Sequence, residues 1–182
     1  MRCALLNFIP LLLVSACADQ SISPEAQGVA PSAQVSQGPI VHRVSLGGPD
    51  ICESFGATPG CDANFSLVAI QFENGQVMGQ LTDQYGPADG LHAQIDCLQV
   101  RVVPGRTTLE AWVGGVVTRP AYQVGHRIIA WLRDNGTSDN DPRPDALSRG
   151  IVDPEEEGYS SNCHDMPLIG LGRLFQGQVT IW

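Results

Sequence analysis

Short apolar runs rich in β-branched and aromatic residues follow one another along this chain, and their spacing constrains the fold most. The three strongest, residues 91–103, 107–118 and 126–132, are separated by a Pro-Gly turn and by the segment RPAYQVG. Runs of this length with Gly and Pro between them are typical of antiparallel strands joined by turns. No window shows a convincing 3.6-residue period, so we expect little helix.

Further strand signals lie on both sides of these runs. Residues 64–72 are apolar on both faces, and Asn74-Gly75 then leads into residues 77–82. Asn-Gly between two such runs predicts a hairpin, because both residues accept positive φ. Four further runs complete the pattern: 39–46, 147–152, 168–174 and 175–182. About eight short strands predict an all-β domain over residues 39–182, folded as a single antiparallel β-sandwich or small barrel.

The alternation of apolar residues changes phase within residues 91–103. Odd-numbered positions are apolar first and even-numbered ones afterwards: Leu91, Ala93, Ile95 and Cys97, then Leu98, Val100 and Val102. A slip of one residue turns every following side chain to the other face of a sheet. We therefore expect a bulge or twist near Cys97-Leu98.

The charge composition excludes one class of partner. The formal net charge is −9, there is no Lys, and only 16% of the residues are charged, against about 25% in ordinary globular proteins. Nucleic-acid binding depends on basic side chains that neutralise phosphates, so no nucleic-acid partner is expected. The acidic balance favours solubility.

Residues 1–16 have the pattern of a secretory signal peptide, with Arg2 near the start, a mostly apolar run over residues 4–14, and then two small residues. The apolar run is too short to cross a hydrocarbon core of about 30 Å as a helix. Val14-Ser15-Ala16-Cys17 resembles the lipobox of bacterial lipoproteins. This resemblance implies cleavage before Cys17 and acylation of that residue with fatty acids such as palmitate. An ordinary signal peptide cleaved nearby is the alternative.

Residues 17–38 are expected to form an acylated Cys17 and a disordered tether. Residues 18–38 contain no aromatic side chain and are rich in Ser, Ala, Gln, Pro and Gly. Such a segment buries too little apolar surface to offset the entropy of ordering. Several lipid chains on one residue anchor a domain stably to a membrane. Ala18 stands where an Asp commonly signals inner-membrane retention, which favours a lipid-anchored location in the cell envelope, at the outer membrane or cell surface.

Several motifs within residues 63–182 resemble a group of uncharacterised secreted bacterial β-domains, which occur alone or behind surface-anchored modules. They are DCLQV at 96–100, AWVGGVVT at 111–118, DNG at 134–136, PRPDALS at 142–148, CHDMP at 163–167 and GQV at 177–179. The resemblance implies an all-β fold and an exported location, and it implies no known reaction. The loop from Cys52 to Cys61 is not part of the shared pattern.

Four cysteines remain once Cys3 leaves with the leader and Cys17 is acylated: Cys52, Cys61, Cys97 and Cys163. An even number in an exported domain suggests disulfides, and three pairings are possible. We favour Cys52 with Cys61, which are close in sequence, and Cys97 with Cys163, which would tie the central strands to the loop before the last ones. Free thiols or a metal site are the alternatives, although no CxxC spacing indicates zinc.

The polar loop 133–149 is a weak candidate calcium site. Its oxygen-bearing side chains are Asp134, Asn135, Asp139, Asn140, Asp141 and Asp145. Calcium takes six to eight oxygen ligands, often from one loop. The spacing does not follow the EF-hand rule, and the same residue types are common in turns. We therefore predict no metal or cofactor.

No catalytic motif stands out, and GxSxG, HExxH and phosphate-binding Gly loops are absent from the sequence. Asp96 and Glu110 are candidates for the paired carboxylates of a glycosidase, but both lie on polar faces of their strands. The other candidates are the sequence-adjacent Cys163-His164-Asp165, the histidines His42, His92, His126 and His164, and Trp112, Trp131 and Trp182 as a sugar platform. Their spacing favours structural roles.

These patterns predict a lipid-anchored envelope protein whose β-domain is a non-enzymatic binding or structural module. The expected partners are the membrane, through the lipid, and an envelope protein or glycan. Two alternatives remain. One is a barrel that binds a small apolar ligand, and the other is a glycan-acting hydrolase with converging carboxylates.

Overall fold

The computed structural model describes residues 38–48, 62–85, 90–136, 143–148, 150–174 and 177–182. The predicted leader and tether with Cys17, the predicted Cys52–Cys61 bridge, and the calcium candidates Asp139 and Asp141 lie outside these residues. Within the described part, no helix is long and apolar enough to span a membrane.

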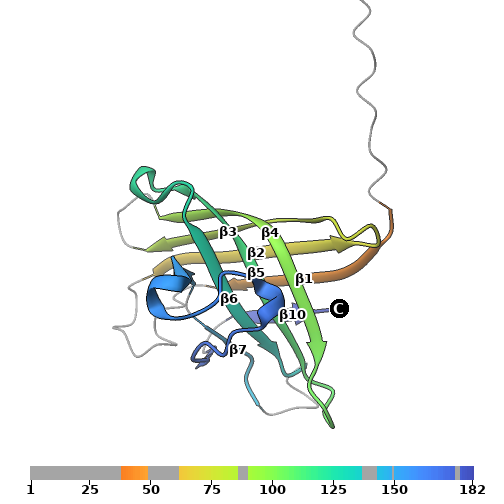
Figure 1. The fold of residues 1–182 in the computed structure, drawn as a ribbon. Helices are drawn as coiled ribbons and strands as arrows, with labels where there is room; N and C mark the ends of the chain where they lie inside the picture. Colours follow the sequence, from red (N-terminus) through yellow and green to blue (C-terminus); the bar gives the residue numbers. More distant parts are fainter. Residues whose placement is uncertain (1–37, 49–61, 86–89, 137–142, 149, 175–176) are drawn as a thin grey trace, which may run out of the picture. The chain divides into compact units, whose positions relative to one another are not determined.

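The domain is all-β, as predicted. Ten strands form one sheet in the order β10-β1-β2-β3-β4-β5-β6-β7-β9, and β8 also pairs with β6 (Figure 1). The strands are β1 (Ile40–Gly48), β2 (Asp62–Phe72), β3 (Val77–Tyr85), β4 (Leu91–Val102), β5 (Leu109–Arg119), β6 (Arg127–Asp134), β7 (Ala146–Leu147), β8 (Ile151–Val152), β9 (Gly172–Arg173) and β10 (Gln178–Ile181). Three short 3-10 turns are η2 (Ala121–Gln123), η3 (Pro154–Glu157) and η4 (Cys163–Asp165). Every strand pair is antiparallel.

The predicted hairpin is present, and two of the other predicted strands are shorter or divided in the structure. In the hairpin, however, only Gly75 of the Asn-Gly pair takes a positive φ, of 81°. Asn74 contributes through its side chain, whose Oδ1 accepts a hydrogen bond from the backbone N–H of Gln76 at 2.9 Å. The predicted run 147–152 forms two short strands, β7 and β8, and the run 168–174 keeps only the two residues of β9.

The predicted bulge is present in β4, one residue earlier than expected. The pairing of β4 with β5 shifts between Ile95 and Cys97, so the extra residue is Asp96. Ile95 and Leu98 are both buried in the core, in agreement with the change of phase. The expectation that Cys97 shares the face of Ile95 is wrong, because the bulge turns Cys97 to the outer face, where it bonds to Cys163.

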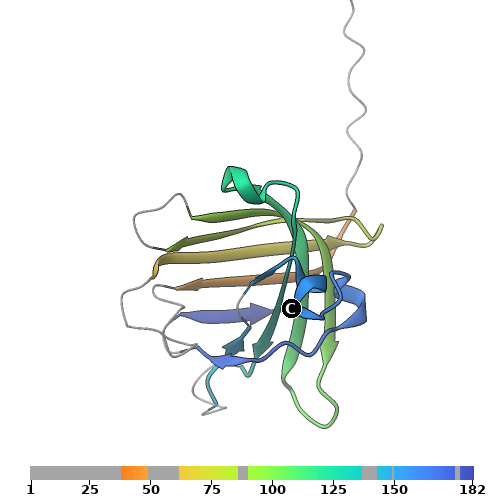
Figure 2. The ribbon, with the colours of Figure 1, turned by 60° about the vertical axis from the view of Figure 1, so that its left-hand side comes forward.

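One cluster of buried apolar side chains packs inside the curled sheet. It consists of Val44, Leu46, Phe65, Leu67, Ala69, Leu81, Leu91, Ala93, Ile95, Leu98, Ala111, Val113, Val117, Ile128, Ala130, Leu132, Leu147, Leu174, Val179 and Ile181. Each large apolar side chain that is fully buried contributes about 1.5–3 kcal/mol. Figure 2 shows the strands curving round this interior.

Glycines permit the tight curvature at the centre of the sheet. Ile95 of β4 pairs with Gly79 on one side and Gly115 on the other. A Cβ on Gly79 would stand 2.1 Å from the carbonyl oxygen of Val68, and one on Gly115 would stand 2.4 Å from that of Gln94. The backbones therefore approach more closely here than any side chain allows.

Replacing Gly115 by Ala is expected to lower the free energy of unfolding by about 1–3 kcal/mol or more, because the clash is with backbone that cannot rotate away. Gly170 is the matched control, since a Cβ there meets nothing within 4 Å and its φ is ordinary. Gly170→Ala should change stability by less than about 0.5 kcal/mol. Urea unfolding of both variants measures the difference, and equal effects would contradict the role given to Gly115.

Two carboxylates accept hydrogen bonds from backbone N–H groups of β10 where this strand meets β6. Arg43 and Trp182 exchange backbone hydrogen bonds, so by alternation the N–H groups of Val179 and Ile181 point away from β1. They donate instead to side chains, Val179 to Asp145 Oδ2 and Ile181 to Asp134 Oδ2, both at 2.9 Å. These two carboxylates satisfy strand-edge amides that would otherwise lack partners in the interior.

Asp145 makes this contact sensitive to pH. Burial raises the pKa of Asp145 above its usual 3.8, against the hydrogen bonds from the Asn135 and Val179 N–H groups that lower it. Because the folded state holds the proton more tightly than the unfolded state, the contribution of Asp145 to stability is largest below pH 3.8. It falls as the pH rises through the raised pKa.

Asp145→Asn is therefore expected to cost about 1–3 kcal/mol, since the amide oxygen can accept only one of the two N–H bonds well. The stability difference between wild type and variant should shrink as the pH rises above 3.8. Urea unfolding across this range measures it, with Glu156→Gln, on the exposed turn η3, as the control. A difference that grows with pH would contradict the raised pKa.

Candidate functional site

The outer face of β4, β5 and β6 carries side chains in regular rows across the three strands. The ladder pairs Arg101 with Glu110 and Glu110 with Arg133, which forms a charged row. The next rows are Gln99–Trp112–Trp131 and Cys97–Gly114–Ile129. Side chains directly opposite on adjacent antiparallel strands lie close enough to interact, so each row acts as one unit.

The two tryptophans form the centre of a second, smaller core on this face. Trp112 and Trp131 stack with ring centroids 5.4 Å apart and planes 10° from parallel. Trp112 is fully buried, and its indole N–H donates to the carbonyl oxygen of Pro167 at 2.9 Å. The indole N–H of Trp131 is buried and has no acceptor among the described residues. Trp112 and Trp131 are thus covered, which does not favour them as a sugar-binding platform, whereas Trp182, the third residue of that prediction, is 53% exposed.

The chain after β8 covers this core. In Figure 1 the blue C-terminal segment, including η3 and η4, lies across β5 and β6. It contributes Tyr159, Cys163, Met166, Ile169 and Leu171 to the cluster around the tryptophans. We call residues 158–171 the cover.

A disulfide joins the cover to the sheet. Cys97 of β4 bonds to Cys163 of η4, with Cα atoms 6.0 Å apart and a sequence separation of 66, so this predicted pairing is confirmed. Gly114 makes room for it, because a Cβ there would lie 3.2 Å from that of Cys97. Met166 closes η4 in the left-handed region, at φ 48°.

The charged row has one buried acid between two arginines. The side chain of Glu110 is 1% exposed. Its Oε2 accepts hydrogen bonds from Arg101 Nε at 3.0 Å and Nη2 at 2.7 Å, and its Oε1 accepts from Arg133 Nε at 2.8 Å and Nη2 at 2.6 Å. A buried carboxylate needs such pairing to remain charged. The side chains of Arg101 and Arg133 are 41% and 32% exposed.

Both guanidinium groups also lie over the tryptophan rings. The Cζ of Arg101 is 4.8 Å from the ring centroid of Trp112, and the Cζ of Arg133 is 5.4 Å from that of Trp131. Cation–π contacts of this kind contribute about 0.5–1 kcal/mol where partly exposed. The arginines therefore lie between the covered tryptophans and solvent. Glu110 holds them by hydrogen bonds, and the tryptophan rings hold them by cation–π contacts.

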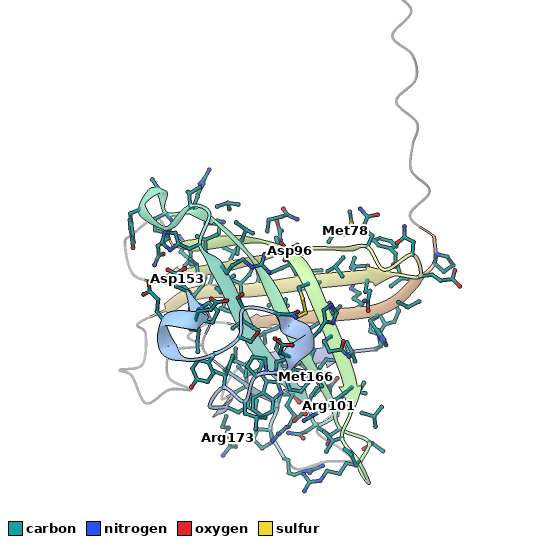
Figure 3. All side chains as sticks on the ribbon, in the orientation of Figure 1. Met78, Asp96, Arg101, Asp153, Met166 and Arg173 are labelled. Atoms are coloured by element: carbon teal, nitrogen blue, oxygen red, sulfur yellow. A yellow bond between two sulfur atoms is a disulfide. The ribbon has the colours of Figure 1, made fainter. Side chains whose placement is uncertain are left out.

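Arginines and acids are unevenly distributed along the strands in this part of the domain. Five arginines lie where β4 and β6 end, together with the carboxylates of Asp134 and Asp145: Arg101, Arg106, Arg133, Arg143 and Arg173. Acids gather near the start of β6: Asp96, Asp153, Glu155, Glu156 and Glu157. Figure 3 shows this distribution, with Arg101 and Arg173 in the lower part of the view and Asp96 and Asp153 above them.

The structure does not bring the candidate glycosidase carboxylates together. Asp96 lies beside Gly114, four residues from Glu110, which is about 13 Å along β5. Catalytic pairs stand about 5–9.5 Å apart. Each acid is also bound by arginine. Asp96 accepts hydrogen bonds from both terminal nitrogens of Arg127, at 2.6 and 2.9 Å.

The Cys163-His164-Asp165 cluster has no nucleophile arrangement. The sulfur of Cys163 is in the disulfide, and His164 Nδ1 contacts Gln99 Oε1 at 2.9 Å. Cys97, Cys163 and His164 are the only described residues whose ligand atoms gather closely enough for a metal, and the two sulfurs are bonded to each other. Among the other histidines, His126 pairs with Asp153, while His42 and His92 lie on β1 and β4.

The described half of the calcium candidate has a structural use. Asp134 accepts backbone hydrogen bonds from Gly136 and Ile181, and Asp145 accepts them from Asn135 and Val179. All four carboxylate oxygens are thus engaged in joining β10 to the end of β6. Calcium binding therefore gains no support from Asp134 and Asp145.

The fold and this surface define an antiparallel, curled-sheet domain with a disulfide-fastened cover and an arginine row beside it. Searches of protein-family models, curated proteins and solved structures found no match to the chain. The resemblance to secreted bacterial β-domains stays a prediction.

The arginine row was missed at the level of sequence. Glu110 shares its parity with Trp112, and Arg133 with Trp131, which places each charge next to a tryptophan on one face. This placement of a charged residue two positions from a tryptophan is visible in the sequence of each strand. The register that aligns Arg101, Glu110 and Arg133 depends on the bulge at Asp96, which no local pattern locates to the residue.

Proposed function

We propose that this is an exported, lipid-anchored protein of the cell envelope whose β-domain is a non-enzymatic binding module. The observation that carries the proposal is the Cys97–Cys163 disulfide, which fastens the cover over the tryptophan core. Disulfides of this kind persist in oxidising compartments outside the cytoplasm. The lipobox-like Val14-Ser15-Ala16-Cys17 supplies the anchor, with residues 18–38 as tether.

The binding surface in this proposal is the arginine row, Arg101 and Arg133 with Glu110 between them. Its side chains are charged, partly exposed and held in place, which suits recognition by an envelope protein or glycan. Asp96 and Glu110 are each neutralised by arginine, so a binding role accounts for them better than acid–base catalysis does. The packed interior gives no support to a barrel that binds a small apolar ligand.

Lipid attachment is tested by expressing the full chain in a Gram-negative bacterium with labelled palmitate. The wild-type protein should take up label and fractionate with membranes. Cys17→Ser should lose both properties, whereas Ser15→Ala, next to the cleavage site, should keep them. Label on the Cys17→Ser protein, or an unlabelled wild type in the cytosolic fraction, would overturn the proposed anchoring.

A further inference from the structure

We propose that Arg101 and Arg133 form a binding site for a ligand that carries two oxyanion groups, either carboxylates or phosphates. The inference rests on the proposed binding function and names the ligand class of the same surface. Three observations carry it: the free edges of the two guanidinium groups, their fixed position, and the positive charge that remains on the row after Glu110 is paired.

Each guanidinium uses only one of its edges inside the protein. The edge formed by Nε and Nη2 binds Glu110, in Arg101 and in Arg133 alike. The edge formed by Nη1 and Nη2 remains, and Nη1 has no acceptor among the described residues in either case. This edge is a planar fork of two N–H donors whose spacing matches the two oxygens of a carboxylate or phosphate.

Both forks are fixed before any ligand arrives. Glu110 holds each arginine by two hydrogen bonds, and the stacked Trp112 and Trp131 support the guanidinium planes. An ordinary surface arginine loses conformational entropy when it binds a ligand. Arg101 and Arg133 have already lost much of that entropy in the folded protein, so the pair binds an anion better than two mobile arginines would.

The row keeps a positive charge after internal pairing. Glu110 offsets one of its two arginines, which leaves one positive charge on the row itself. In a chain of formal net charge −9, a fixed positive charge at this position favours an anion there.

Two groups on one ligand fit better than one. Because Arg101 Nη2 and Arg133 Nη2 both bond to the carboxylate of Glu110, at 2.7 and 2.6 Å, they lie within about 8 Å of each other. A dianion of that span reaches both forks, and the second contact forms at a high effective concentration.

Arg127 is a matched control on the same face. Its side chain is 33% exposed, as Arg133 is 32% exposed. Its Nη1 and Nη2 are both engaged by Asp96, however, so its fork is occupied. Substituting Arg127 should therefore leave anion binding unchanged.

The test follows the indole N–H signals of Trp112 and Trp131 by NMR in the full-length protein, in neutral detergent and at constant ionic strength set with chloride. Pyrophosphate and inorganic phosphate are titrated separately, and polygalacturonate serves as a polymeric carboxylate. We expect saturable shifts, with pyrophosphate binding about tenfold or more tightly than phosphate. Saturation by pyrophosphate alone indicates a small-molecule ligand, and saturation by polygalacturonate indicates a glycan-borne one.

Arg101→Lys and Arg133→Lys keep the ion pair with Glu110 but lack the fork. Each should weaken pyrophosphate binding about fivefold or more without changing the fold, as checked by the disulfide and the amide spectrum. Arg127→Lys should bind as the wild type does. Equal affinity for phosphate and pyrophosphate, or equal losses in all three variants, would overturn the site while leaving the palmitate result for Cys17 unaffected.

Discussion

Replacing Glu110 by Gln is expected to lower the free energy of unfolding by about 3–5 kcal/mol, because it leaves two closely spaced guanidinium groups without their shared counter-charge. The amide can accept from one arginine but directs its own N–H groups at the other. The stacked tryptophans beneath would then face unbalanced positive charge. Chemical unfolding of the two proteins, followed by tryptophan fluorescence, measures the loss.

Asp96→Asn is the matched comparison for this prediction. Asp96 also binds an arginine with two hydrogen bonds, but its side chain is 46% exposed, whereas Glu110 is 1% exposed. Exposed ion pairs contribute about 0–1 kcal/mol, so Asp96→Asn should have a small effect. The triple replacement Arg101→Met, Glu110→Leu and Arg133→Met should recover most of the stability lost in Glu110→Gln. Similar costs for Glu110→Gln and Asp96→Asn would show that burial does not govern this network.

Removing the bridge with Cys97→Ala and Cys163→Ala is expected to cost about 4 kcal/mol, since it frees a loop of 66 residues in the unfolded chain. The cover should also loosen, because the described contacts that then hold it on the sheet are packing, the Trp112–Pro167 hydrogen bond and the contact between His164 and Gln99. Tryptophan emission should shift to longer wavelength as water reaches the stacked rings. Both the loss of stability and the shift in emission are expected from removal of this one disulfide.

The wild-type protein in a strong reductant provides the control for that double variant. Its unfolding midpoint and tryptophan emission should approach those of Cys97→Ala with Cys163→Ala. A double variant as stable as the oxidised wild type, with unchanged emission, would show that packing and hydrogen bonds hold the cover without the disulfide.

Much of the fold follows from local sequence. The hairpin at Asn74-Gly75 depends on Gly75, which takes a positive φ, and the strands depend on period-two alternation, which is visible without tertiary information. The same alternation signalled the phase change in β4. It located the bulge only to within a residue, because Asp96 and Cys97 both suit an outer face, and the choice between them is made by pairing with β5.

The surface itself depends on contacts that sequence periodicity does not encode. The row of Arg101, Glu110 and Arg133 brings together three strands in a register fixed by the bulge. The polar loop around Asp134 and Asp145 was interpreted by residue type as a weak calcium candidate. Its carboxylates instead accept N–H groups from β10, a strand more than 30 residues away, and only the curled sheet brings these partners together.

The most direct measurement is the intact mass of the protein recovered from envelope membranes, before and after reduction and thiol alkylation. A lipid-held, exported domain predicts a chain that begins at Cys17, carries fatty-acyl groups there, and gains alkyl groups at Cys97 and Cys163 only after reduction. A chain that still begins at Met1, without acyl groups and with both thiols alkylated before reduction, would contradict it.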